Sequence, residues 1–467
     1  GCGGDPVPAV RWETSDIRID GGDAAEVDPD SLGARFCSDG ADARYAVWTD
    51  DRSGVESVWF SASTDGGATW SEAVNPTGSD AAARVPAIGC DAASVQLVWE
   101  DTRTGVLGLS NVFQTASTDG GATFSLPTNV SRDINGHFDA RNPTVAVAGD
   151  EVYVAYMQDL YGSFDVFVAA SADRGATFAI PQRVEPGTAG ETWSGWPQLA
   201  AAGGGLVYAV WEDMRNGAID VLFAASTDGG ATWVDQSRVD LGDEPGATDS
   251  GRPRIAAADG QVWVVWHDAR VGGENFGIFA NYRVDGGAWL EPALRVDGAD
   301  AAVFAAVEPE LVVSNGAAHV VWSDDRWGSF DVYTRVIGAG TLTGDEIALD
   351  HSGTGFTAIN PRIAARDGRI AVVWEDNRWD LEGGHDDLYY TVSEDDGASW
   401  LDHDLQLNSY AQGAAWAIDA WPWITADGDL QTGWTDGRLG TADVYTSTLA
   451  LGEAASIPDN TTVGGEP

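Results

Sequence analysis

Basic residues are scarce in this chain of 467 residues. There is no lysine: the 25 basic residues are all arginine, against 73 aspartates and glutamates, which gives a formal net charge of −48. Such a polyanion repels nucleic acids and anionic membranes, so we predict no nucleic-acid partner. The charge suits an exported protein, or a setting rich in salt or divalent cations.

Long apolar runs and several catalytic signatures are missing as well. No stretch approaches the ~18 apolar residues of a membrane-spanning helix. The six histidines are scattered, with no pair at zinc-ligand spacing, and neither Gly-x-Ser-x-Gly nor a P-loop motif occurs. The sequence therefore gives no support to a zinc enzyme, an α/β-hydrolase or a P-loop enzyme.

Cysteine occurs at only three positions. Cys37 and Cys90 fall in equivalent strands of neighbouring repeats and are a candidate disulfide in an oxidising compartment, which their Cα separation would test. Cys2, within Gly1–Gly4, resembles the lipid-bearing cysteine that remains after a bacterial lipobox is cleaved. We therefore expect an exported protein, either secreted or held at the cell surface as an outer-membrane lipoprotein, with membrane contact only through a lipid on Cys2.

The chain is built on a repeat. Trp-x-Asp-x-Arg occurs seven times, Tyr156–Leu160 is a degenerate eighth copy, and the first residues of successive copies lie 51 to 60 residues apart. The seven copies begin at Trp48, Trp99, Trp211, Trp266, Trp322, Trp374 and Trp434. Each follows an apolar, β-branched run that is typical of a strand buried on both faces. A regular period of this length indicates one solenoid or propeller rather than several separate domains.

Each repeat predicts four strands. Four antiparallel strands in ~55 residues, repeated radially, make a blade, so the expected fold is an all-β, eight-bladed β-propeller. The last repeat lacks a fourth strand, and residues 12–25 parallel the fourth strand at 289–302, so we expect an N-terminal strand to close the last blade. The propeller would span residues 10–451, between an N-terminal tether (1–9) and a flexible C-terminal tail (452–467). Seven blades with one extra sheet is the alternative.

A second motif, Ser-x-Asp-x-Gly-x-Thr-Trp/Phe, occurs in five copies with small variations. Its glycines supply positive φ and its aspartate accepts backbone N–H bonds, so the motif predicts a hairpin turn with a structural aspartate. The five aspartates are Asp65, Asp119, Asp173, Asp228 and Asp395. The motif resembles the Asp box of the sialidase-like (BNR-repeat) β-propellers.

This resemblance implies a functional face opposite the Asp boxes, on the side of the Trp-x-Asp-x-Arg turns. It also implies an arginine triad for a substrate carboxylate, a Tyr/Glu nucleophile pair and an acid/base aspartate, normally on six blades. The sequence shows only weak Arg-x-Pro echoes, at Arg84, Arg141 and Arg252, and no assignable Tyr/Glu pair. No catalytic residue can therefore be carried over.

The aspartate and arginine of Trp-x-Asp-x-Arg are two residues apart and project the same way from an extended chain. Because seven repeats share the pair, we interpret it as scaffold that joins neighbouring blades by charge-assisted hydrogen bonds. An electrostatic collar around the central channel is the functional alternative. Ligand binding is then expected where a blade departs from the repeat.

The third repeat departs most. Gln158 and Leu160 replace the acid and the arginine, and the flanking loops carry rings, a carboxylate, a histidine and an arginine, the ingredients of a sugar or peptide site. The candidate ligand-binding residues are His137, Asp139, Arg141, Tyr161, Trp193 and Trp196. Packing of the rings between blades is the alternative.

The seventh repeat carries an acidic loop with Asp380, Glu382, Asp386 and Asp387. Calcium takes six to eight oxygen ligands, so these four residues are candidate calcium ligands, and calcium is the one cofactor that the sequence suggests. The spacing matches no EF-hand, and a solvated acidic loop is the alternative.

These observations predict a binding or scaffold protein that engages a glycan or a surface protein through the face opposite the Asp boxes. The alternatives are a sialidase-type glycoside hydrolase that acts on terminal sugars and a structural subunit of a cell-surface assembly. Arginines that converge near one acid would favour the hydrolase, a broad aromatic face the binder, and a large apolar flank the assembly. Two-carboxylate glycosidase chemistry also stays open, since it needs only two acids at a suitable separation.

Overall fold

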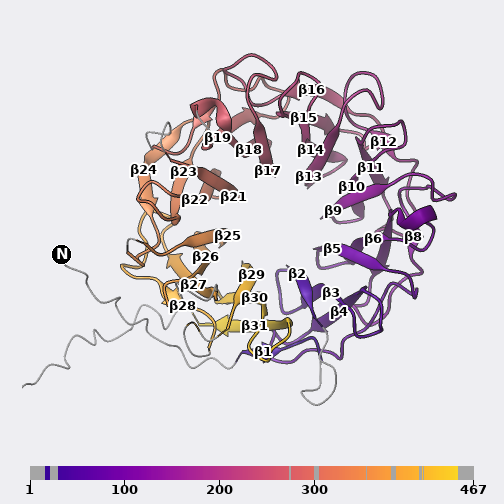
Figure 1. The fold of residues 1–467 in the computed structure, drawn as a ribbon, viewed down its shortest axis with the longest axis horizontal. Helices are drawn as coiled ribbons and strands as arrows, with labels where there is room; N and C mark the ends of the chain where they lie inside the picture. Colours follow the sequence, from indigo (N-terminus) through magenta and orange to yellow (C-terminus); the bar gives the residue numbers. More distant parts are fainter. Residues whose placement is uncertain are drawn as a thin grey trace, which may run out of the picture.

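The computed structural model describes residues 16–21, 30–272, 275–298, 304–353, 355–379, 385–409, 413 and 415–450. Within these ranges, eight antiparallel sheets stand side by side around a central axis (Figure 1). The only helical turns in the same ranges are two short 3-10 helices, η1 (Val106–Gly108) and η2 (Ala269–Val271). The protein is therefore an all-β, eight-bladed propeller, as the repeats predict. No helix in the described part of the chain is long and apolar enough to cross a membrane.

The blades are numbered 1 to 8 in the order of their inner strands. The inner strands are β2 (Leu32–Ser38), β5 (Ala83–Cys90), β9 (Ala140–Ala148), β13 (Ser194–Gly203), β17 (Ser250–Ala258), β21 (Ala306–Ser314), β25 (Ala358–Arg366) and β29 (Ala417–Ile424). The second strands are β3 (Arg44–Asp50), β6 (Val95–Asp101), β10 (Glu151–Gln158), β14 (Leu206–Asp213), β18 (Gln261–Asp268), β22 (Ala317–Asp324), β26 (Arg369–Asp376) and β30 (Leu430–Asp436). The third strands are β4 (Ser57–Ser63), β7 (Asn111–Ser117), β11 (Asp165–Ser171), β15 (Asp220–Ser226), β19 (Gly277–Val284), β23 (Asp331–Ile337), β27 (Asp387–Ser393) and β31 (Asp443–Leu449).

Most of the outer strands are shorter. They are β8 (Thr128–Asn129), β12 (Gln182–Arg183), β16 (Val234–Arg238), β20 (Leu294–Arg295), β24 (Leu342–Ala348), β28 (Leu405–Gln406) and β1 (Ile17–Arg18). Blade 1 has three strands, and a bridge between Phe60 and Val74 stands in place of its fourth.

The N-terminal segment closes the ring. β1 pairs antiparallel with β31, with Ile17 opposite Thr446 and Arg18 opposite Tyr445, so it supplies the fourth strand of blade 8. Asp20 adds a contact, since its Oδ2 accepts a hydrogen bond from the Val444 N–H at 3.1 Å. The expected closure is thus confirmed. The proposed tether with Cys2, and the proposed tail, lie outside the described residues.

One large ring per blade fills the core. The tryptophan of every Trp-x-Asp-x-Arg copy, and Tyr156 in blade 3, is fully buried. Each of these residues lies on a second strand, which has a neighbouring blade on either face, and this explains the continuous apolar runs in the sequence. Trimming such a buried ring to alanine costs about 3–5 kcal/mol, so these rings make a large contribution to stability.

The five Ser-x-Asp turns share one hydrogen-bond pattern. In each turn the aspartate Oδ1 accepts the serine hydroxyl at 2.7–2.9 Å and the backbone N–H four residues on at 2.8–2.9 Å. Its Oδ2 accepts the hydroxyl of the same later residue at 2.6 Å. These hydrogen bonds, chiefly the one from Thr232, lower the pKa of Asp228 to about 2. The aspartates thus hold the turns between the third and fourth strands.

Cys37 and Cys90 form a disulfide with their Cα atoms 6.0 Å apart. The two cysteines lie on β2 and β5, so the bond links the inner strands of blades 1 and 2. The structure therefore pairs the two cysteines that the repeats place in equivalent strands.

Candidate functional site at the axis of the ring

The Trp-x-Asp-x-Arg turns join the blades. Each arginine bonds the aspartate two residues before it, and most also reach the preceding blade: Arg103 donates to the Thr77 carbonyl at 2.8 Å, and Arg378 lies 3.0 Å from Asp350. Arg438 instead lies 2.7 Å from Asp16, next to β1 of its own blade, so it ties the N-terminal segment to blade 8. These contacts confirm the scaffold interpretation. The arginines of the repeat are therefore already neutralised inside the blade junctions.

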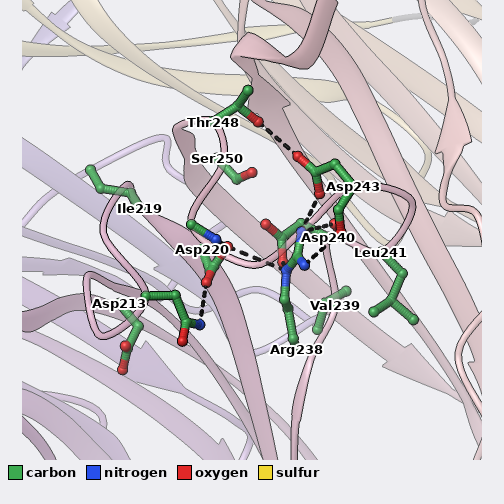
Figure 2. Close-up of polar contacts among 12 residues, drawn as sticks. Asp213, Ile219, Asp220, Arg238, Val239, Asp240, Leu241, Asp243, Thr248 and Ser250 are labelled. Carbon is green, nitrogen blue, oxygen red and sulfur yellow. Dashed lines mark hydrogen bonds and ion pairs between the residues drawn. The ribbon is translucent and has the colours of Figure 1, made fainter.

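Buried carboxylates crowd these junctions. Figure 2 shows the guanidinium of Arg238 between Asp220, Asp240 and Asp243, with Nε 2.8 Å from Asp240 Oδ1 and 3.3 Å from Asp220 Oδ1. Burial raises the pKa of Asp240 to about 7, against the opposing effect of Arg238. Thr248 donates to Asp243 Oδ2 at 2.8 Å. We assign this cluster to the scaffold, because its charges are met by side chains of the same junction.

The junction of blades 6 and 7 holds the closest group of acids. One oxygen each of Asp350, Asp376 and Asp404 lies within 4.8 Å of the others, a spacing that a metal ion could use. The guanidinium of Arg378 contacts all three carboxylates. A protein cation thus holds this group together.

The inner strands carry a repeated bulge. In every blade the pairing between the inner and second strands shifts register at one residue with φ between 51° and 63°, in the left-handed region. These residues are Gly33, Val85, Asn142, Trp196, Arg252, Glu308, Asn360 and Asp419. A bulge bends its strand and re-aims the side chains that follow.

Glutamates of the repeat hold several of these bulges. Glu100, Glu212 and Glu375 accept the backbone N–H of the bulge residue of the next blade at 2.9, 2.8 and 2.9 Å. Burial raises the pKa of Glu375 to about 7. Since three blades repeat this contact, the glutamates position the bulges rather than define a single site.

The residue two positions after each bulge residue differs in type from blade to blade. In each blade it pairs with the residue just before the buried tryptophan or tyrosine of the second strand. In blade order the eight residues are Arg35, Ala87, Thr144, Gln198, Arg254, Glu310, Arg362 and Trp421. Charged or aromatic residues thus occupy five consecutive blades, 5 to 8 and 1, while blades 2 to 4 carry small or neutral ones. A repeat protein is expected to carry its function at structural positions whose residues vary between repeats.

We call Arg35, Arg254, Glu310, Arg362 and Trp421 the axial cluster. Glu310 Oε1 lies 2.8 Å from Arg254 Nε and 2.5 Å from Arg362 Nη1, which joins blades 5, 6 and 7. The guanidinium carbons of Arg35 and Arg362 lie 5.1 and 5.4 Å from the centre of the Trp421 ring. The side chains of Arg254, Glu310 and Arg362 remain 28, 17 and 23% exposed, so solvent reaches the cluster.

The axial cluster carries three positive charges against one negative. Burial opposes ionisation of Glu310, but Arg254, Arg362 and Arg35 together outweigh it and hold its pKa below its usual value. Burial in turn lowers the pKa of Arg35, while nearby Asp419 acts in the opposite direction. Glu310 is therefore an ionised counter-ion and not a proton donor. The arrangement can bind an anion, since guanidinium groups pair well with carboxylates.

Among the ligand-binding candidates of blades 3 and 4, Asp139 and Arg141 are the pair that bonds directly within the described residues, with Arg141 Nε 2.5 Å from Asp139. Asp139 is buried and also accepts the N–H of Ser110, next to β7 of blade 2, at 2.9 Å, so it links blades 2 and 3. His137 is exposed, and within the described residues no hydrogen bond, ion pair or ring stacking joins it to the other candidates. The contacts of Asp139 are therefore structural ones at the junction of blades 2 and 3.

The aromatic candidates of blades 3 and 4 differ in exposure and in their place in the fold. Tyr161 is 54% exposed, with its ring 6.4 Å from that of Phe167. Trp196 is the bulge residue of blade 4 and is 51% exposed, whereas Trp193 is half-buried. Trp196 alone among these rings thus belongs to the bulge ring near the axis.

The calcium candidates are only partly described. Asp380 and Glu382 lie outside the described residues, and Asp386 is half-buried just before β27. Asp387 is buried: its Oδ1 accepts the Asn408 amide and its Oδ2 accepts the Gly413 N–H, both at 2.9 Å. Burial raises the pKa of Asp387 to about 6. Asp387 therefore acts as a structural acceptor, and calcium at this loop stays a prediction.

No protein-family model and no curated protein matches the sequence. Solved structures share its fold: the polysaccharide lyase Uly1 has a TM-score of 0.50 at 13% identity, over 78% of this chain and 89% of that one. The GH93 α-L-arabinofuranosidase of Fusarium graminearum has a TM-score of 0.41 at 16% identity, over 69% and 97% of the two chains. The Hadza microbial sialidase Hz136 has a TM-score of 0.38 at 15% identity, over 77% of each. At 13% identity, the similarity to Uly1 shows the fold alone.

Proposed function

We propose that this protein is an exported glycan-binding propeller that takes a carboxylate-bearing saccharide at the axial cluster. The observation that carries the proposal is the convergence of Arg35, Arg254 and Arg362 on one glutamate in a chain whose net charge is −48. The arginines of the Trp-x-Asp-x-Arg motif are already paired with acids inside the blade junctions. A solvent-accessible excess of positive charge at the axis therefore favours an anionic ligand over the neutral and cationic ones.

The choice of a glycan rests on two further points. The fold is shared with a polysaccharide lyase, Uly1, which makes polysaccharides the first ligand class to test. The acidic surface also disfavours the dense phosphate charge of nucleic acids and anionic membranes more than it disfavours a saccharide with one carboxylate per unit. A uronic or sialic acid unit offers a planar carboxylate for the guanidinium groups.

The test is calorimetric titration with acidic and neutral saccharides, namely oligogalacturonate, sialyllactose and lactose. Wild-type protein should bind at least one acidic saccharide, and Arg362→Ala should weaken that affinity at least tenfold, because a charge-assisted pair is lost. Glu310→Gln should tighten binding, because the competing carboxylate is removed. Arg174→Ala, at an Arg174–Asp150 pair in a Ser-x-Asp turn on the opposite face, is the charge-matched control and should change nothing. Equal affinity of wild type and Arg362→Ala would contradict the proposal.

A glycoside hydrolase that acts on acidic terminal sugars is the second candidate. It is favoured by the same convergence of arginines on one acid. Burial raises the pKa of Glu375 to about 7. Glu375 lies three residues before Arg378, on the second strand of blade 7, which pairs with the strand of Arg362. It is the acid with a raised pKa that lies nearest to Arg362 on that strand. Turnover of fluorogenic glycosides, sialosides included, with and without calcium, separates the two candidates: hydrolysis that Glu375→Gln abolishes makes the protein an enzyme, and no turnover leaves a binder.

A further inference from the structure

Two tryptophans occupy the same turn position in adjacent blades. Trp327 in blade 6 and Trp379 in blade 7 each follow the arginine of a Trp-x-Asp-x-Arg copy. Trp327 is 69% exposed, far more than a tryptophan usually is, and Trp379 is partly exposed. The corresponding residues of the other blades are Ser53, Thr104, Tyr161, Asn216, Val271 and Leu439.

A buried tyrosine fixes each of these rings. Trp327 Nε1 donates to the Tyr333 hydroxyl at 3.0 Å, and Trp379 Nε1 donates to the Tyr389 hydroxyl at 2.7 Å. Both tyrosines are in turn covered by the preceding arginine, with guanidinium carbons 4.1 and 3.7 Å from the ring centres. An indole has only one hydrogen-bond donor. With that donor engaged, Trp327 presents a flat, pre-oriented apolar surface to solvent, and Trp379, which also packs against the core of blades 6 and 7, presents part of its ring.

The other blades provide an internal comparison. Tyr333 and Tyr389 lie on the third strand, opposite the buried tryptophan of the second strand. Blades 1 to 5 have Trp59, Phe113, Phe167, Leu222 and Phe279 there, without a hydroxyl. Tyrosine occurs in blades 6 to 8, and the two blades with a turn tryptophan both have it. Each turn tryptophan thus occurs together with a tyrosine that binds its indole N–H, which indicates that the orientation of the tryptophan ring matters.

Trp327 and Trp379 lie in the same sector of the ring as the axial cluster. Blades 6 and 7 supply Glu310 and Arg362 to that cluster, and their second strands end at these turns. Strands of a sheet are spaced by about 4.8 Å, so the turn between the second and third strands lies roughly 5–10 Å outward from the inner strand. One extended ligand can therefore reach both places.

We propose that Trp327 and Trp379 form a stacking platform for consecutive pyranose rings of a linear polysaccharide that lies along blades 6 and 7. The apolar face of a pyranose suits an isolated, flat ring, whereas a protein interface needs a contiguous apolar patch. Nucleic-acid bases also stack on such rings, but the charge of −48 repels their phosphates. The inference rests on the glycan class of the proposed function, but it uses the apolar faces of the sugars rather than a carboxylate.

The test uses neutral chains, so that it can fail independently of the axial cluster. Cellohexaose, xylohexaose and mannohexaose are titrated into the full protein, with tryptophan fluorescence and calorimetry as readouts. Trp327→Ala should weaken the affinity for the chain that binds about tenfold, and Trp327→Phe, which keeps a ring, by less than about threefold. Leu439→Ala, at the same turn position in blade 8, where the side chain is 53% exposed, should change nothing.

Tyr333→Phe tests the hydrogen bond that orients Trp327, since it removes only the hydroxyl that accepts this bond. We expect it to weaken binding severalfold while thermal unfolding of the variant stays close to that of the wild type. An unchanged affinity of Trp327→Ala, an equal loss in Leu439→Ala, or no binding of any neutral chain at ~10 mM would overturn the platform. Loss of oligogalacturonate binding in Arg362→Ala, with cellohexaose binding kept, would show that the two sites act separately.

Discussion

At the scale of single residues, Ser194 shows how protons are placed inside the blade junctions. Its hydroxyl lies 2.7 Å from Glu185 Oε2 and 2.9 Å from Asp213 Oδ2, yet it has one proton to donate. Burial would raise the pKa of Asp213, but Arg215 outweighs it and holds this pKa below its usual value. Burial raises the pKa of Glu185 to about 7. Glu185 is therefore the partner that carries a proton near neutral pH.

This assignment predicts the effect of Glu185→Gln, which imitates the protonated acid. Because the folded-state pKa of about 7 lies above the ordinary value, the stability from this group is complete at low pH and is lost as pH rises through 7. The variant should match the wild type at pH 5 and exceed its free energy of unfolding at pH 8 by on the order of 2 kcal/mol. Urea unfolding at both pH values measures this difference. A variant less stable than the wild type at pH 8 would show that Glu185 is ionised in the junction.

The axial cluster could not be predicted from the sequence, because its residues come from distant parts of the chain. Arg35 and Trp421 are far apart in the chain, and they meet only because the ring closes between blades 8 and 1. A signal was present: the eight blades agree at most buried positions but differ at the residue two beyond the bulge. Departure from the repeat in blade 3 was the more visible signal, but Asp139, one of its candidates, serves the contact between blades 2 and 3.

At the scale of elements, the second strands were predictable because burial on both faces forces an unbroken apolar run, as in β14 and β26. The bulges of the inner strands were not. Val85 adopts φ 51°, which a β-branched residue rarely does, and no local sequence rule indicates it. The neighbouring blade supplies the reason at equivalent bulges, where Glu100 or Glu212 bonds the backbone N–H.

The closing strand β1 was predictable from its likeness to another fourth strand, and it leads to a prediction of its own. Removal of residues 1–21 should expose the edge of β31, lower the unfolding temperature and cause self-association, since an unpaired edge recruits other strands. Light scattering after gel filtration measures the association. Removal of residues 1–9 alone, which keeps β1, is the control and should leave a stable monodisperse protein. An unchanged oligomeric state without β1 would mean that the contacts of β31 with β30 suffice.

At the scale of the whole molecule, charge is the dominant feature. Many arginines are paired with acids inside junctions and turns, so the excess of 73 acidic over 25 basic residues leaves a surface that repels itself. Such repulsion acts over the Debye length, which shrinks from about 30 Å at 0.01 M salt to about 3 Å at 1 M. The compact ring should therefore gain stability from salt, although its internal ion pairs are buried and lose little.

We expect the unfolding temperature to rise by several degrees between 0.01 and 1 M NaCl, with KCl giving the same curve because the effect is screening and not specific binding. Differential scanning calorimetry measures it. Calcium chloride compared at matched ionic strength then tests the acidic loop of blade 7: an additional rise at millimolar calcium would indicate a specific site that includes Asp386. An unfolding temperature that falls with NaCl would show that exposed salt bridges, rather than the net charge, dominate the electrostatics of this protein.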